Sequence, residues 1–313
     1  MEPKPLFFGI EIPQFFFDGP VDVEHVRKFT IRAEALGYDS LWLQERIVSD
    51  FSMLEPVSLL SYAAAITDRV RLGVSVVLLT LRNPLQLAKS IATLDCMSGG
   101  RAVLGIGLGG GHLGSHEEIF GYGRERRVRR FTEAVAILKL LWTEPRASFH
   151  GTFWSFDGVP MEPKPVQKPH VPIWFGGHHE NALRRAVRYG DGWMGAGSSS
   201  SSAFVRESSR IRDLLEQAGR DPETFAVSKR VYLAVDDDRQ RAERRLREWF
   251  GRRYGNPDLG PKVCVWGGVR ECTERIREIV RAGARGIVFN PMFDEMEHLE
   301  ICAAEIAPHL SSV

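Results

Sequence analysis

Two patterns of apolar and polar positions alternate along the chain. Short runs rich in apolar and β-branched residues, typical of buried strands, are followed by longer stretches with an apolar residue every three or four positions, typical of amphipathic helices. The predicted strands are residues 7–12, 40–43, 70–77, 102–106, 173–175, 192–195, 225–233 and 286–289. The predicted helices are residues 23–36, 56–67, 84–97, 126–142, 181–189, 203–218, 239–252, 272–282 and 295–307. This alternation predicts a parallel sheet covered by helices.

Several predicted helices are followed by a glycine that marks their end. Gly37, Gly219 and Gly283 stand where a left-handed residue commonly ends a helix. Eight strand–helix units within 313 residues match the size and order of a (β/α)₈ TIM barrel, so we predict one α/β domain over residues 1–313. A doubly wound open sheet is the alternative, but its usual G-x-G-x-x-G sequence after the first strand is absent.

Two segments are too long for simple connections, one after the fourth strand and one after the seventh. Residues 145–172 hold prolines at positions 160, 163, 165, 169 and 172, which exclude a helix or central strand there and predict an extended insertion. Residues 254–268 are rich in turn-forming residues, and we interpret them as a mobile lid over the barrel mouth.

Composition narrows the classes of protein. Lys and Arg number 41 against 40 Asp and Glu, a formal net charge of +1, so binding driven by phosphate neutralisation on nucleic acid is excluded. The four cysteines form no C-x-x-C pair, and no run approaches the roughly 20 apolar residues of a membrane span. We expect a soluble cytoplasmic protein that binds neither nucleic acid nor membrane.

Active sites of such barrels lie beyond the carboxyl ends of the strands, where this chain has two glycine-bearing turns. Gly176 and Gly177 separate the fifth strand from a helix, and residues 195–200 (GAGSSS) repeat the arrangement one unit later. Free N–H groups at two helix starts favour the binding of an anion. The simpler interpretation is that the glycines only form tight turns and that Ser202 caps a helix. The glycine-rich residues 105–111, after the fourth strand, suit close approach of the backbone to a flat ligand.

Metal binding is not predicted. His112 and His116 lack the H-E-x-x-H order, and of the adjacent His178 and His179 only one can face a given ion. The G-x-S-x-G sequence of serine hydrolases is also absent.

The motifs together resemble the luciferase-like flavin-dependent oxidoreductases, a family of (β/α)₈ barrels that includes bacterial luciferase and deazaflavin-dependent enzymes. The resemblance covers nearly the whole chain. It is carried by residues 8–14 (FGIEIPQ), 36–42 (LGYDSLW), 81–84 (LRNP), 87–89 (LAK), 92–95 (ATLD), 98–101 (SGGR), 163–167 (PKPVQ), 172–177 (PIWFGG) and 190–193 (GDGW).

The resemblance implies a flavin-type ring across the barrel mouth, with its phosphate held after the fifth and sixth strands. It also implies a bulge in the third strand with a non-prolyl cis peptide, by position Ser75–Val76, that supports the ring. The cofactor-binding residues expected on this basis are Gln14, Ser75, Val76, Gly107, Gly176, Gly177, His178, Gly197 and Ser198.

One departure from the family pattern falls at the end of the second strand. Many members have Asp-His there, and this chain has Glu45-Arg46. An arginine cannot act as an ordinary acid or base, but it can clamp an anion or a carbonyl group. We name Glu45, Arg46 and His112 as catalytic candidates, with a Glu45–Arg46 salt bridge that only holds the strand end as the alternative.

The resemblance favours an oxidoreductase that transfers a hydride between coenzyme F420 and a small, apolar organic substrate. The alternative is an FMN-dependent monooxygenase that uses reduced flavin and oxygen. A separate flavin or F420 reductase would then supply the reduced cofactor. A flavin-binding protein without turnover belongs to another class, and the charged residues at the mouth argue against it. A cofactor-free hydrolase lacks a visible nucleophile. We also expect a homodimer or higher homo-oligomer.

Overall fold

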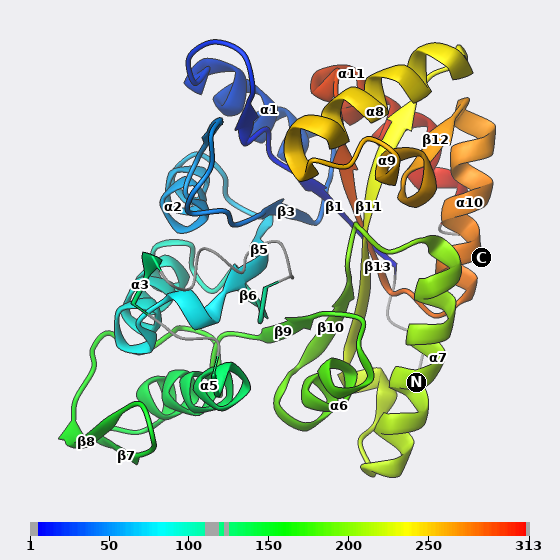
Figure 1. The fold of residues 1–313 in the computed structure, drawn as a ribbon. Helices are drawn as coiled ribbons and strands as arrows, with labels where there is room; N and C mark the ends of the chain where they lie inside the picture. The colour runs from blue at the N-terminus through cyan, green and yellow to red at the C-terminus, as the bar shows by residue number, and fades with distance from the viewer. Residues whose placement is uncertain (1–5, 110–118, 122–124, 311–313) are drawn as a thin grey trace.

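A computed structural model describes residues 6–109, 119–121 and 125–310. Within these residues, eight parallel strands form a closed barrel (Figure 1). They are β1 (Phe7–Glu11), β3 (Ser40–Leu43), β5 (Arg71–Leu78), β6 (Ala102–Gly107), β9 (Ile173–Gly176), β10 (Gly192–Gly195), β11 (Ala226–Val235) and β13 (Gly286–Pro291). Each strand pairs with the next in chain order, and β13 pairs with β1. The predicted barrel is confirmed, and closure excludes the open sheet.

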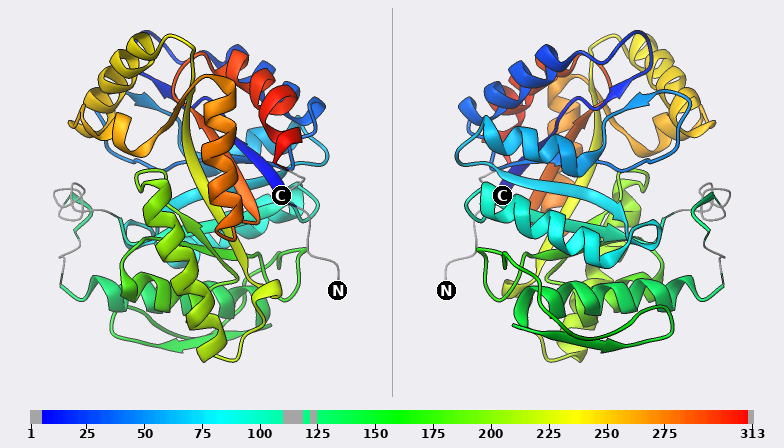
Figure 2. Two further views of the ribbon diagram at one scale, coloured as in Figure 1. Left: turned by 90° about the vertical axis from the view of Figure 1, so that its right-hand side faces the viewer. Right: turned by 90° about the vertical axis from the view of Figure 1, so that its left-hand side faces the viewer.

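Helices surround the barrel on its outer side (Figure 2). They are α1 (Val23–Ala35), α2 (Pro56–Ala65), α3 (Pro84–Met97), α5 (Arg127–Thr143), α6 (Glu180–Tyr189), α7 (Ser201–Gln217), α8 (Arg239–Tyr254), α10 (Val269–Arg281) and α11 (Glu295–Ile301). The start of α3 shows how local sequence fixes a boundary. Asn83 caps this helix by accepting the Leu85 N–H at 2.9 Å, and Pro84 occupies the first turn, where its missing N–H costs nothing.

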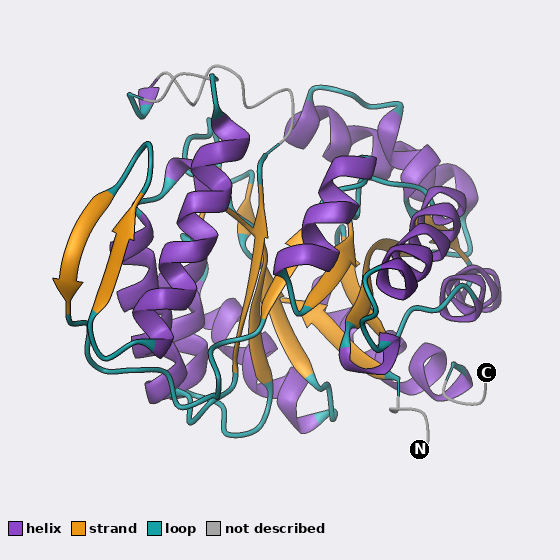
Figure 3. Cartoon of the chain, turned by 90° about the horizontal axis from the view of Figure 1, so that it is seen from below, coloured by secondary structure: helices purple, strands orange, loops and turns teal. Residues whose placement is uncertain are grey.

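The proline-rich insertion follows α5 and is extended, as predicted. Strands β7 (Ala147–His150) and β8 (Ser155–Val159) form an antiparallel hairpin outside the barrel (Figure 3). After the hairpin, the Glu162–Pro163 and Lys168–Pro169 peptide bonds are cis.

The interpretation of residues 254–268 as a lid is wrong. This segment forms α9 (Leu259–Val263) and β12 (Val265–Gly267), and β12 pairs with the end of β11. Gly260 lies so close to α8 that an added Cβ would stand 2.8 Å from the Phe250 ring. Cys264 and Val265 are buried, so the segment is part of the barrel wall.

The barrel interior is apolar near its base and polar near its mouth. Trp42 and Trp174 stack at 5.2 Å inside the lower half, together with Val103, Met194 and Val288. Above them lie buried polar side chains from the carboxyl halves of the strands. No helix within residues 6–109, 119–121 or 125–310 combines the length and apolar content that a membrane crossing requires.

Candidate active site

A cavity of about 550 Å³ opens at the carboxyl ends of the barrel strands. It is lined by side chains and backbone from β5, β6, β9, α5, α6 and the end of α8. Many of the residues expected from the sequence lie together in its wall: Glu45, Ser75, Val76, Gly107, Gly176, Gly177, His178 and Ser198.

The peptide bond between Ser75 and Val76 is cis, as the family resemblance implied. It falls where the pairing of β5 with β6 shifts register, so the expected bulge is present too. The Val76 side chain projects toward Gly107 and Gly176, where added Cβ atoms would lie 2.6 and 2.9 Å from its methyl groups. These two glycines therefore make room for Val76. The sequence predicted that glycines after the fourth strand allow a ligand to approach the backbone closely, but at Gly107 it is the Val76 side chain that does so.

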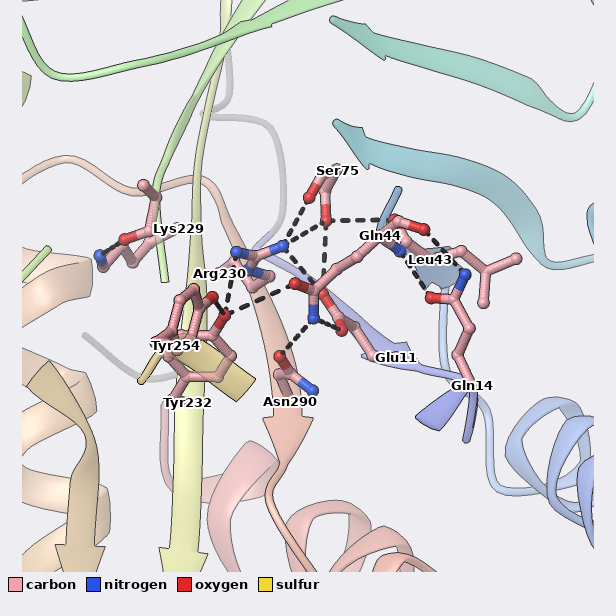
Figure 4. Close-up of polar contacts among 11 residues, drawn as sticks. Glu11, Gln14, Leu43, Gln44, Ser75, Lys229, Arg230, Tyr232, Tyr254 and Asn290 are labelled. Atoms are coloured by element: carbon pink, nitrogen blue, oxygen red, sulfur yellow. Dashed lines mark hydrogen bonds and ion pairs between the residues drawn. The ribbon is translucent and has the colours of Figure 1, made fainter. Parts of the chain in front are cut away.

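A buried charged network forms the floor of the cavity (Figure 4). The Arg230 guanidinium donates to the Ser75 carbonyl at 2.5 Å and lies 3.4 Å from a Glu11 carboxylate oxygen. Gln44 donates to the other Glu11 oxygen at 2.6 Å and to Asn290 at 3.2 Å. Burial raises the pKa of Glu11 and Arg230 opposes that rise. The network thus holds the carbonyl group of the cis peptide itself in place.

Sequence reasoning missed Arg230, although two adjacent cations, Lys229 and Arg230, stand within an otherwise apolar strand and gave a usable signal. The Arg230 Nε atom is buried and has no hydrogen-bond partner in the part of the chain that the structure describes. Gly197 does not line the cavity, contrary to its assignment as a cofactor residue. It packs over Arg230 instead, because a Cβ there would lie 2.8 Å from Nε.

Glu45 is buried in the cavity wall, and its partner is Arg82. Arg82 donates through Nε at 2.7 Å to the carboxylate, and the Leu78 N–H bonds the other oxygen. Burial raises the pKa of Glu45, and the charge of Arg82 opposes that rise. The suggested salt bridge between Glu45 and Arg46 is wrong, because the two side chains of adjacent residues point in different directions.

Arg46 lies outside the cavity wall. Its guanidinium donates to the Arg253 carbonyl at 2.8 Å and to the Val48 carbonyl at 3.3 Å, and it lies over the Phe51 ring. The role of a clamp on a reacting group does not fit this position. The third catalytic candidate, His112, lies outside the described residues.

Gln14 is also turned away from the cavity. Its amide accepts the Gln44 N–H at 2.9 Å and donates to the Gln44 and Leu54 carbonyls at 2.8 and 2.5 Å. All of these bonds fix the loops after β1 and β3. Gln14 borders a separate cavity of about 340 Å³, so its assignment as a cofactor residue is corrected to a structural one.

The other end of the cavity is cationic. His179 caps α6, and Ser200, rather than Ser202, caps α7. The start of α6 lines this end of the cavity, and so does Ser198 in the loop before α7. Arg127 and Arg185 line it as well, and burial together with the charge of Arg127 lowers the pKa of Arg185. Two neighbouring cations beside helix starts are suited to a phosphate group.

Lys229 supports the loop at this end from below. Its ammonium donates to the Ser199 carbonyl at 2.8 Å, to the Ser199 hydroxyl at 2.9 Å and to the Ala196 carbonyl. Burial lowers the pKa of Lys229 to about 7. The loop that carries Ser198 is thus fixed by the buried amino group of Lys229.

Comparisons with known proteins agree with this geometry. The sequence model of the luciferase-like monooxygenase family matches residues 10–286, and the chain belongs to that family. It is therefore an oxidoreductase, as predicted. The F420-dependent glucose-6-phosphate dehydrogenase of Kineococcus radiotolerans is 31% identical over 229 residues, covering 71% of this chain and 67% of the relative.

Two solved structures share the fold. An F420-dependent secondary alcohol dehydrogenase in complex with an F420-acetone adduct superposes with a TM-score of 0.85 at 20% identity, covering 98% of this chain and 99% of that one. The oxygenating constituent of 3,6-diketocamphane monooxygenase from Pseudomonas putida, in complex with FMN, gives a TM-score of 0.80 at 18% identity, covering 97% and 98%.

Proposed function

We propose that the protein transfers a hydride between coenzyme F420 and a small organic substrate. The observation that carries the proposal is one continuous cavity that joins the Ser75–Val76 cis peptide to a cationic end bordered by Arg127 and Arg185. Its volume of about 550 Å³ lies within the usual range for ligand pockets, roughly 300–1,000 Å³.

The residues present fit a deazaflavin. Val76 supplies an apolar ledge for a flat ring, and Arg230 contributes positive charge to the cavity floor. The helix starts of α6 and α7, with Arg127 and Arg185, supply donors and positive charge for a phosphate-bearing tail. When bound, F420 supplies the ring carbon that accepts or gives the hydride.

The chain's own groups fix charges and dipoles in the wall of the cavity. Arg82 and the Leu78 N–H hold the Glu45 carboxylate in the cavity wall, and Arg230 holds the Ser75 carbonyl. Such fixed dipoles and charges act on a reacting centre without having to reorganise. A binding protein without turnover has no need of converging buried charges, so this arrangement favours an enzyme.

Relatives named for F420 support the deazaflavin, whereas the FMN complex that shares the fold supports the alternative. In that alternative, the protein is a monooxygenase that receives reduced FMN from a separate reductase. The tail of F420 carries carboxylates in addition to phosphate, and two arginines at the cationic end suit the more anionic ligand.

Titration of the purified protein with F420 and with FMN, followed by fluorescence, tests the proposal. We expect F420 to bind at least about tenfold more tightly than FMN, a difference of about 1.4 kcal/mol. Reduction of bound F420 by candidate alcohols, followed by absorbance, then tests turnover. Equal or tighter binding of FMN would overturn the choice of cofactor.

A further inference from the structure

Arg253, the penultimate residue of α8, is a buried cation for which the described residues provide no ion-pair partner. Its residue is 7% exposed, and the Nε atom is buried without a hydrogen-bond partner. Among the residues that the structure describes, no hydrogen bond or ion pair involves its side chain. Because arginine stays protonated at physiological pH, the buried charge cannot be removed by loss of a proton.

Aromatic rings surround this guanidinium. Its central carbon lies 5.0 Å from the centre of the Phe15 ring, 5.1 Å from Tyr254 and 5.9 Å from Phe51. Ring faces stabilise a cation but leave its N–H donors without acceptors. Within the described part of the chain, the positive charge of Arg253 therefore lacks the carboxylate partner that buried arginines normally have, and its Nε–H lacks an acceptor.

Other arginines of α8 show the usual arrangement. Arg241 pairs with Asp236 at 2.7 Å, Arg245 with Asp294 at 2.5 Å, and Arg247 with Glu243 at 2.7 Å. Arg252, the immediate neighbour, pairs with Asp18 at 2.7 Å on the exposed side of the helix. One of these carboxylates, Glu243, lies in α8 itself and the others lie in neighbouring segments, so the arginines named here are paired whereas Arg253 is not.

Arg253 borders the cavity beside Tyr254, on the side of the floor formed by Gln44 and Arg230. Its charge is close enough to the floor to oppose the burial-driven rise in the pKa of Glu11. The cationic end at α6 and α7 is made by other residues, which the proposed function assigns to the phosphate-bearing tail.

We propose that Arg253 binds an oxyanion of the substrate, a carboxylate or a phosphate, which places the substrate among small organic acids or phosphate esters. A planar fork of N–H donors matches two oxygens of either group. Tyr254, the aromatic neighbour of Arg253 that lines the same cavity, provides an apolar ring face for the remainder of the molecule. This inference rests on the proposed function only in assigning the oxyanion to the substrate.

Isothermal titration calorimetry with benzoate, phenyl phosphate and neutral benzamide tests the inference on F420-loaded and cofactor-free protein. Arg253→Met removes the charge at similar length, and Arg253→Lys keeps the charge without the fork. Arg252→Met is the matched control, because it removes an adjacent cation that already has a partner.

We expect benzoate or phenyl phosphate to bind the parent protein and Arg252→Met at least tenfold more tightly than benzamide. In Arg253→Met this preference should disappear, in Arg253→Lys it should be partly kept, and the F420 dissociation constant should stay within threefold of the parent. Thermal unfolding should show that Arg253→Met is no less stable, since it removes an unpaired buried charge.

If neither benzoate nor phenyl phosphate binds the parent protein more tightly than benzamide, the inference is overturned, whether or not Arg253→Met folds. So would an unchanged anion preference in folded Arg253→Met. A loss of F420 affinity with anion binding intact would assign Arg253 to the cofactor. An anion preference that depends on Arg253 in a protein that does not bind F420 would support the oxyanion site while refuting the proposed function.

Discussion

Lys229 and Arg230 are neighbours on β11, and their side chains leave the strand on opposite faces, as successive residues of a strand do. The Arg230 side chain points into the barrel and donates to the Ser75 carbonyl. The Lys229 side chain points outward and donates to the carbonyls of Ala196 and Ser199. One strand thus supports both the floor of the cavity and its cationic end.

The buried Lys229 makes stability depend on pH. Its pKa is lowered by burial to about 7 in the folded protein, against 10.5 in the unfolded chain. Between these values the unfolded chain binds one more proton, so the free energy of unfolding should rise with pH across this window, by at most about 1.4 kcal/mol per pH unit. Above pH 10.5 this gain in the free energy of unfolding is complete, because Lys229 is neutral in both states. Below about pH 7 the gain is absent, because Lys229 is protonated in both states.

Urea unfolding of the parent protein and of Lys229→Met at pH 6.5, 8 and 9.5 isolates this contribution. The difference between the two proteins should shift in favour of the parent as pH rises. A difference that stays constant over the three pH values would show that Lys229 does not titrate in this range.

At the scale of elements, α5 and α6 bring Arg127 and Arg185 to the same end of the cavity. Arg185→Met should weaken F420 binding at least about tenfold, because a charge-assisted hydrogen bond contributes about 1.5–3 kcal/mol. Arg184→Met is the matched control, since the adjacent Arg184 pairs with Glu180 at 2.7 Å. Fluorescence titration of both variants gives the two dissociation constants.

An Arg185→Met protein that binds F420 like the parent would place the phosphate elsewhere. Gly177 offers a poorer test of the same site. Its φ is +119°, and an added Cβ would lie 3.0 Å from Ala182, so a larger residue would disturb the backbone as well as any ligand.

At the scale of the whole molecule, the mouth of the barrel carries the site and the base carries stability. Arg101 directly precedes β6, at the base. All five of its N–H donors are used, with acceptors on Ser98, Thr67, Val70 and Ala64. The S-G-G-R motif that contributed to the family resemblance therefore ties α2, α3 and β5 together far from the cavity.

Arg101→Met should lower the free energy of unfolding by about 2 kcal/mol or more, because it leaves several carbonyl groups without donors. The F420 dissociation constant of the folded variant should not change. Arg71→Met, at an exposed position of the same end, is the control. Denaturant unfolding and cofactor titration measure the two effects, and a loss of affinity without a loss of stability would contradict this division.

The sequence by itself determined the barrel. All eight strands lie within a few residues of their predicted positions, because strands buried on both faces form continuous apolar runs between helices with marked ends. Glycines in the turns after β9 and the family resemblance also located much of the cavity wall, including the Ser75–Val76 cis peptide. The strands and the glycine-bearing turns depend on short segments, so local sequence was sufficient for them, whereas the cis peptide was expected only from the family resemblance.

Only the tertiary structure decided which charges meet. Glu45 pairs with Arg82, 37 residues away, and not with the adjacent Arg46. The Gln14 side chain hydrogen-bonds the loop after β3 to the loop after β1, and Arg230 reaches Ser75 across the barrel. Arg253 borders the cavity and finds no ion-pair partner among the described residues. The physical reason is that barrel closure sets the direction of each side chain and brings distant residues within reach, and neither follows from the order of residues along the chain.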